Sequence, residues 1–345
     1  MTEQRGFASD NNAGVHPDVL AALARANVGH VSGYGHDPYT ERVQATFRAQ
    51  FGPHASAYLV FNGSGANVLC MRAACRRFEA AICAPTAHVN VDECGAPEAI
   101  AGVKLLIAEA SNGKLAPEAV ERLIVRVGDE HAVQPRLVTI SQATELGTVY
   151  SLDELRALVE LAHSRRMVVH VDGARLANAA ASLGVSLRAL TTDVGIDLVS
   201  FGGTKNGLLG AEAVVVLNSE LGSGLDFLRK QTLQLASKMR YLAVQFEALL
   251  GEGLWLRLAS HANAMAAKLA EAVRDLSGLE ITQPVQANAV FAVLPAQATA
   301  ALQERFRFYV WDEHTGEVRW MCSWDTTEED VEAFVAAVRA ALADC

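Results

Sequence analysis

The chain has 345 residues, of which 51% are hydrophobic and 20% charged, a balance typical of globular proteins and unlike that of disordered or membrane-spanning chains. Its formal net charge of −10 argues against nucleic acid or an anionic membrane as the main partner, because both require clustered Lys and Arg. A small-molecule substrate fits this charge better. The N-terminal segment lacks a basic start followed by an apolar stretch, and no apolar run approaches membrane-spanning length, so we expect a cytoplasmic protein.

Seven short apolar runs in the first two thirds of the chain predict the strands of one mainly parallel sheet. They are rich in Val, Ile and Leu, end at turn residues and alternate with amphipathic segments, as expected of an α/β fold built from βαβ units. The runs lie at 57–61, 80–84, 103–108, 136–141, 167–171, 198–202 and 213–217. The short link at 208–210 leaves no room for a crossover helix, so we expect the last strand to run antiparallel.

Helical spacing appears between these runs at 66–78 and at 151–166. The second segment opens with Ser151 as N-cap and has Glu154 three residues later, which is the pattern of a capping box. A long helical stretch is predicted near 225–250.

The last third of the chain changes pattern and predicts a smaller α+β unit. Another helical segment at 253–276 is followed by strand candidates at 288–295, 307–313 and 317–324 around one short helix. A final helix follows Thr327, with Asp330 three residues later and an apolar stripe along one face. Because a chain of this length usually divides, we predict an N-terminal segment and large domain at 1–250 and a small C-terminal domain at 251–345.

The six cysteines show no spacing of metal ligands, and we predict no metal site. Most of them stand among apolar residues, so we interpret them as reduced thiols of the core. They are Cys70, Cys75, Cys83, Cys94, Cys322 and Cys345.

The strongest chemical signal is the pair of motifs HVDGARLANA at 170–179 and SFGGTKNG at 200–207. Each begins at the carboxyl end of a predicted buried strand, and this edge of an open α/β sheet forms the ligand crevice, so Asp172 and Lys205 should face one pocket. Pyridoxal phosphate requires a lysine that forms an imine and a carboxylate that keeps the pyridine nitrogen protonated. Arg175, one turn beyond Asp172, is a candidate for holding the cofactor or a substrate carboxylate.

Two other strand ends carry supporting residues. Gly63 and Ser64 open a helix after the first strand, and backbone N–H groups at a helix N-terminus suit a phosphate. The segment matches neither the Walker A motif nor the dinucleotide-binding fingerprint. His88 follows the second strand, where an imidazole can stack on a cofactor ring or act as a base.

Taken together, these motifs resemble the low-specificity L-threonine aldolases, most closely their phenylserine-aldolase branch. The resemblance covers nearly the whole chain and keeps the order of the family's motifs. The matching segments are 7–14, 34–42, 61–67, 86–98, 139–155, 170–179, 201–207, 235–240, 284–291 and 319–326.

The resemblance implies a pyridoxal-phosphate enzyme of fold type I, with active sites shared between the subunits of a homodimer or homotetramer. By position, Lys205 is the Schiff-base lysine, Asp172 the partner of the pyridine nitrogen, and His88 the stacking histidine. Gly63 and Ser64 contact the phosphate. The substrate carboxylate is assigned to Ser9, Arg175 and Arg319, and Lys230 or Arg240 is expected to reach the neighbouring subunit's site.

The implied activity is cleavage of β-hydroxy-α-amino acids such as threonine, allo-threonine or phenylserine to glycine and an aldehyde. Where many relatives have a histidine proposed as the base, this chain has QATELG at 142–147, so the base stays open between His88, Glu93, Glu145 and water. Another fold type I reaction, β-elimination or transamination, is the main alternative. A non-enzymatic nucleotide-binding protein is a remote one.

Overall fold

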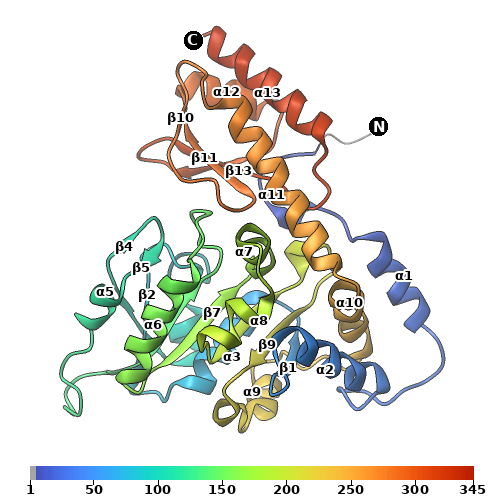
Figure 1. Cartoon of the computed structure of the whole chain (residues 1–345), viewed down its shortest axis with the longest axis vertical. Coiled ribbons are helices and arrows are strands. Elements are labelled where there is room, and N and C mark those ends of the chain that lie inside the picture. Colours follow the sequence, from blue (N-terminus) through green and yellow to red (C-terminus); the bar gives the residue numbers. More distant parts are fainter. Residues whose placement is uncertain (1–4) are drawn as a thin grey trace.

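The computed structural model describes residues 5–345, which form a large body around a seven-stranded sheet and a smaller body around a four-stranded one. Figure 1 shows the large body below and the small body above, with the long helix α11 (Leu254–Val273) running between them. In this part of the chain no helix is both long and apolar enough to cross a membrane.

The large sheet has the order β1-β9-β8-β7-β6-β2-β3, and every one of the seven apolar runs forms one of its strands. Strand β9 pairs antiparallel with both neighbours, and the other pairs are parallel, as the sequence predicts. The strands are β1 (Ser56–Val60), β2 (Glu79–Cys83), β3 (Lys104–Ile107), β6 (Gln134–Ser141), β7 (Val168–Gly173), β8 (Leu198–Gly202) and β9 (Glu212–Val216).

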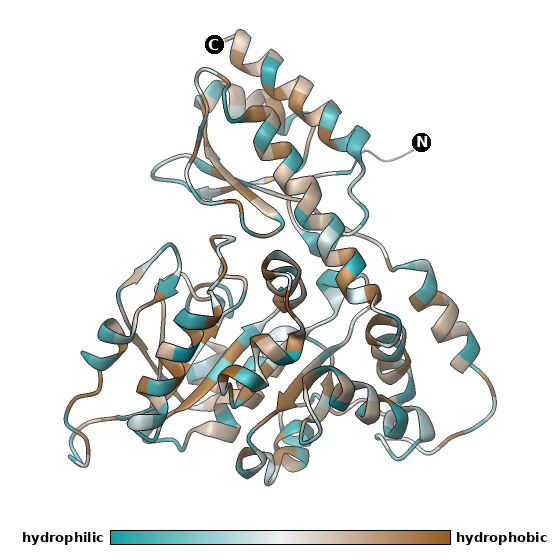
Figure 2. Cartoon of the chain, viewed as in Figure 1, coloured by the Kyte–Doolittle hydropathy of each residue, from teal (hydrophilic) through white to brown (hydrophobic). Residues whose placement is uncertain are grey.

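Helices pack on this sheet because its strands are apolar on both faces. Figure 2 shows the central strands in brown and the outer sides of many helices in teal, and Figure 1 shows α6, α7 and α8 in front of the sheet. The capping box at Ser151 and Glu154 is formed and starts α6. The helices of the large body include α1 (Pro17–Ala26), α2 (Pro38–Phe51), α3 (Gly63–Ala74), α4 (His88–Val91), α5 (Pro117–Glu121), α6 (Leu152–Ser164), α7 (Leu176–Leu183), α8 (Leu187–Leu190), α9 (Leu225–Gln231) and α10 (Arg240–Gly251).

The small body has an antiparallel sheet of order β10-β11-β13-β12 covered by helices. Its aromatic core centres on Phe334 of α13, whose ring lies 4.4 Å from that of Phe7 and 5.1 Å from that of Trp320. The elements are β10 (Glu280–Ile281), β11 (Ala289–Val293), α12 (Ala296–Gln303), β12 (Tyr309–Asp312), β13 (Glu317–Met321) and α13 (Glu328–Ala343). A separate hairpin joins β4 (Ala110–Ser111) and β5 (Lys114–Leu115).

Two hydrophobic cores correspond to the two bodies, and α11 contributes to both. Leu254 packs in the large core, whereas Met265 packs in the small one. Phe7, which the sequence assigns to the large domain, lies in the small core, because its backbone pairs with Arg307 and Met321. The domain boundary near residue 250 stays a prediction.

Two expectations from the sequence are wrong. The stretch near 225–250 is not one helix, because α9 ends at Gln231, Leu233 takes a positive φ of 65°, and α10 begins only at Arg240. Of the six cysteines, Cys94 and Cys345 are exposed instead of lying in the core.

Candidate active site

Lys205 lies on a single 3-10 turn (Thr204–Asn206) directly after β8, and the chain reaches it through two glycines. A Cβ at Gly202 would lie 2.5 Å from the carbonyl oxygen of Ala174, and one at Gly203 would lie 2.6 Å from that of Ala211. Only glycine allows this close packing of the backbone. The glycines therefore fix where the lysine amine is presented.

Asp172 lies near the end of β7, opposite Ser200 of β8 in the sheet register. Its Oδ1 accepts a hydrogen bond from the Ala174 N–H (3.0 Å), and its Oδ2 accepts one from Asn67 Nδ2 (2.9 Å). Asn67 comes from α3 and is buried. The sequence reasoning missed this residue, which holds the predicted pyridine partner in one orientation.

The same amide extends the polar chain to His88. Asn67 Nδ2 also donates to Glu93 Oε1 (2.8 Å), which in turn lies 2.9 Å from His88 Nδ1. The Glu93 side chain is fully buried, and its hydrogen bond to His88 raises the pKa of that imidazole. One side-chain nitrogen or oxygen of each of His88, Glu93 and Asp172 lies within 4.8 Å of the other two. We interpret this cluster as a hydrogen-bonded chain that runs from the histidine through Glu93 and Asn67 to the aspartate.

A site suited to an anion lies at the start of α3. Asn62 is the N-cap and accepts a hydrogen bond from the Gly65 N–H (2.8 Å), while the N–H groups of Gly63 and Ser64 belong to the first turn, which has no partners within the helix. Gln234 closes this turn from the side, because a Cβ at Gly65 would lie 2.4 Å from its amide. The N-terminus of a helix binds phosphate well.

These residues line one cavity of about 270 Å³ at the carboxyl edge of the sheet. Gly63 and Ser64 lie at one part of its wall, Asp172 and His88 at another, and Lys205 beside them. An anion site, a carboxylate, a flat ring and an amine are the groups that pyridoxal phosphate requires. The residues present therefore fit this cofactor.

Buried charges next to the cavity act on Lys205. The positive charge of Arg175 and then burial lower the pKa of the lysine amine, which favours its nucleophilic neutral form. Arg175 is itself held by Asp10, with Nε 2.8 Å from Oδ2 and one terminal nitrogen 2.9 Å from Oδ1. Burial opposes the charge of Asp10, but Arg175 and Lys205 outweigh it and lower the pKa of this carboxyl. The sequence reasoning assigned no role to Asp10.

A second, wider cavity of about 610 Å³ adjoins the first and reaches the small body. It is lined by Ser9, Arg175, Lys205 and Arg319, so the structure brings the predicted substrate residues together. Arg319 stacks over the Trp311 ring at 4.4 Å and donates one hydrogen bond to the Ala8 carbonyl. Its Nε is buried without a partner among residues 5–345, and burial lowers the pKa of the guanidinium to about 10.

Glu145 also lines this cavity. Its Oε1 accepts hydrogen bonds from the His88 N–H (2.8 Å) and from the Ser141 hydroxyl (2.5 Å). Burial raises the pKa of the Glu145 carboxyl above its ordinary value.

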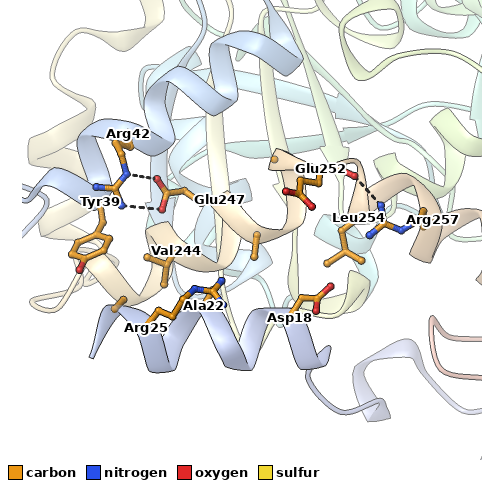
Figure 3. A pocket seen from close by; sticks show the side chains of 13 residues that line it. Asp18, Ala22, Arg25, Tyr39, Arg42, Val244, Glu247, Glu252, Leu254 and Arg257 are labelled. Atoms are coloured by element: carbon orange, nitrogen blue, oxygen red, sulfur yellow. Dashed lines mark hydrogen bonds and ion pairs between the residues drawn. The ribbon is translucent and has the colours of Figure 1, made fainter. Parts of the chain in front are cut away.

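Some candidate residues lie elsewhere. Lys230 is exposed on α9, with its amine 5.3 Å from the Tyr34 ring centre, and Arg240 donates to the carbonyls of Val28 and Gly29. Neither lines the two cavities. A groove of about 750 Å³ between α1, α2 and α10 (Figure 3) contains the Arg42–Glu247 ion pair but none of the predicted site residues.

Comparisons with known proteins agree with this geometry. A family model described as beta-eliminating lyase matches residues 6–297. The chain is 43% identical to a low specificity L-threonine aldolase of Pseudomonas sp. (strain NCIMB 10558), over 99% of each chain, and 44% identical to one of Pseudomonas aeruginosa, over 96% of each. A solved structure of threonine aldolase from Leishmania major superposes with a TM-score of 0.93 at 30% identity, covering 98% of this chain and 99% of that one.

Aspartate aminotransferase from Thermus thermophilus, at 17% identity and a TM-score of 0.70, shares the fold alone. Fold and cavity thus define a pyridoxal-phosphate-dependent lyase of fold type I. More narrowly, the chain belongs to the beta-eliminating lyase family, in the branch formed by the low-specificity L-threonine aldolases.

We expect Lys205→Ala to remove the covalent link to the cofactor and at least 99% of turnover, because the amine that forms the link is gone. Borohydride reduction of the native enzyme followed by peptide mapping should find pyridoxyl label at Lys205. The exposed Lys238→Ala should keep both the visible absorption and the label. Label at any other lysine would refute the assignment.

Proposed function

We propose that the enzyme cleaves L-threonine, L-allo-threonine or L-phenylserine-type β-hydroxy-α-amino acids to glycine and an aldehyde. The observation that carries this proposal is the joined pair of cavities, in which a lysine, an aspartate and an anion site meet the guanidinium of Arg319. Curated relatives of the same length that are named for this activity support it.

When bound, pyridoxal phosphate joins a lysine amine and withdraws electrons from the amino acid whose bond breaks. The role of the protein's own residues would be to hold the substrate in the one orientation in which its Cα–Cβ bond can break. Arg319 and Ser9 do so by binding the carboxylate, which is a contribution of orientation. The Arg175 guanidinium is paired with the Asp10 carboxylate. We therefore assign Arg175 to positioning the N-terminal segment and to lowering the pKa of Lys205.

His88 is our proposed base for the β-hydroxyl proton. Because Nδ1 faces the buried Glu93 carboxylate, the free Nε2 is the nitrogen that accepts the proton. Glu145 is the alternative candidate for the base, because it lines the same cavity but already accepts two hydrogen bonds. In the completed reaction the hydroxyl proton leaves to the base, the Cα–Cβ bond breaks and Cα gains a proton.

The substrate side chain meets the small body. Tyr309 and Trp311 of β12 line the outer cavity with Val91, and they provide an apolar wall that accepts a methyl or a phenyl group.

We propose a homodimer or homotetramer in which Lys230 or Arg240 reaches the site of a second copy. Support comes from apolar side chains exposed around α9: Leu233 is 85% exposed, Phe227 81% and Tyr34 51%. Apolar residues gathered at one surface mark interfaces. We also propose a cytoplasmic location, because none of the six cysteines forms a disulfide, as expected in a reducing compartment.

The reaction is tested by a substrate panel. With threonine and phenylserine the enzyme should release acetaldehyde or benzaldehyde together with glycine in equal amounts, measured by chromatography after derivatisation. Ammonia with an oxo acid would indicate elimination, and conversion of pyruvate to alanine would indicate transamination. A protein that gains no visible absorption with pyridoxal phosphate would favour the nucleotide-binding alternative.

Arg319→Lys should raise KM and also lower kcat for threonine. A guanidinium holds a carboxylate through two parallel hydrogen bonds, whereas an ammonium is a point charge that lets the substrate turn. We expect the activation free energy calculated from kcat/KM to rise by roughly 2–5 kcal/mol, the range for breaking a buried charge pair. Steady-state kinetics with the exposed Arg307→Lys as control measure it. Unchanged constants would move the carboxylate anchor away from Arg319.

Glu93→Gln should move the acidic limb of the kcat/KM profile to lower pH. The Glu93 carboxylate raises the pKa of His88, and a base works only above its pKa, so removing that charge lets His88 work at lower pH. The exposed Glu98→Gln, in the helical turn Pro97–Ala101 that follows, is the matched control and should leave the limb in place. A limb unmoved in Glu93→Gln would assign the base to Glu145 or water.

A further inference from the structure

Glu212 lies on a strand between β1 and β8 and has no role in the reaction proposed above. As the first residue of β9 it stands opposite Val60 of β1 on one side and opposite Gly202 of β8 on the other. Val60 leads into the loop that presents Gly63 and Ser64, and Gly202 leads into the turn that presents Lys205. Glu212 therefore lies between the two strands that lead into these loops.

The Glu212 carboxyl is buried and tied to the lysine turn. Its Oε2 accepts a hydrogen bond from the Gly203 N–H (2.7 Å), and Thr204 hydrogen-bonds to it as well. Burial raises the pKa of this carboxyl to about 7, against the lowering effects of these donors and of the Lys205 charge. The other titratable residues that line the cavity are His88, Asp172 and Lys205, and the residues from Phe61 to Gly65 contribute none.

We propose that Glu212 is a positioning residue that carries a proton when the cofactor phosphate is bound, so that it holds the Lys205 turn as a neutral acid. The proposal extends the cofactor site and does not depend on which amino acid the enzyme cleaves.

The reason is electrostatic. A phosphate monoester carries nearly two negative charges above about pH 6, and it has to share a cavity of about 270 Å³ with Glu212. Two anions in a poorly hydrated cavity repel strongly, and the carboxyl relieves the repulsion by taking up a proton. The neutral acid keeps an oxygen for the Gly203 N–H, so the turn stays in place. It also leaves Lys205 without a counter-charge that would favour the ammonium.

The test compares Glu212→Gln, a neutral isostere, with the wild type in binding to the apoenzyme. Pyridoxine 5′-phosphate is the probe, because it has the phosphate but no aldehyde and so cannot react with Lys205. Above about pH 7 the wild-type Kd should rise relative to that of Glu212→Gln by about tenfold per pH unit, since binding takes up one proton. Calorimetry in buffers of different ionisation enthalpy counts that proton directly.

Three controls decide the outcome. Glu220→Gln removes an exposed carboxylate beyond the other end of β9 and should follow the wild type. Pyridoxine, which lacks the phosphate, should give a Kd ratio that does not change with pH. Should Glu212→Gln fail to fold, the wild type still serves, because phosphate binding should produce the infrared C=O band of a neutral carboxylic acid. A constant Kd ratio with the phosphate probe, or the absence of both proton uptake and this band, overturns the proposal.

Discussion

The buried ion pair between Asp10 and Arg175 is the interaction on which the site depends. Arg175 follows β7 in the large body, whereas Asp10 belongs to the N-terminal segment that pairs with the small one through Phe7. Asn288, just before β11, donates to the same carboxylate at 3.1 Å. One carboxylate thus joins three segments, and breaking such a pair leaves an uncompensated buried charge. It ties the two bodies together beside the outer cavity, where we propose that the substrate binds.

The same pair divides the work of the two arginines. Because Arg175 is hydrogen-bonded to Asp10, its guanidinium stays next to Lys205 and lowers the pKa of the lysine amine, while Arg319 lines the outer cavity. Positive charge near the lysine favours the neutral amine, and positive charge at the outer cavity favours a carboxylate. Arg175 of the large body supplies the first of these positive charges, and Arg319 of the small body supplies the second.

The sequence predicts the sheet and its principal residues because their signals are local. Seven runs rich in Val and Ile correspond to the seven strands of the large sheet. Asp172 and Lys205 can be proposed from the sequence because each follows or ends such a run, at the carboxyl edge where ligands bind in open α/β sheets. Asn67, Asp10 and the break after Gln231 depend on contacts distant in sequence: Asn67 meets a carboxylate 105 residues away, Asp10 meets Arg175 165 residues away, and Ser237 accepts a bond from Tyr34. Local patterns carry no information on such pairs.

Three acids near Lys205 show how one fold gives chemically equal groups different tasks. Asp172 accepts two N–H donors and lines the inner cavity, Glu93 lies against His88 and raises its pKa, and Glu212 is desolvated at the wall of the inner cavity. Tuning by environment is how active sites separate acids from bases. Register assigns these environments, because β7 brings Asp172 beside β8 while the antiparallel β9 returns Glu212 beneath the lysine turn. The antiparallel strand β9, which lies between β1 and β8, is therefore also what places an acid against the Lys205 turn.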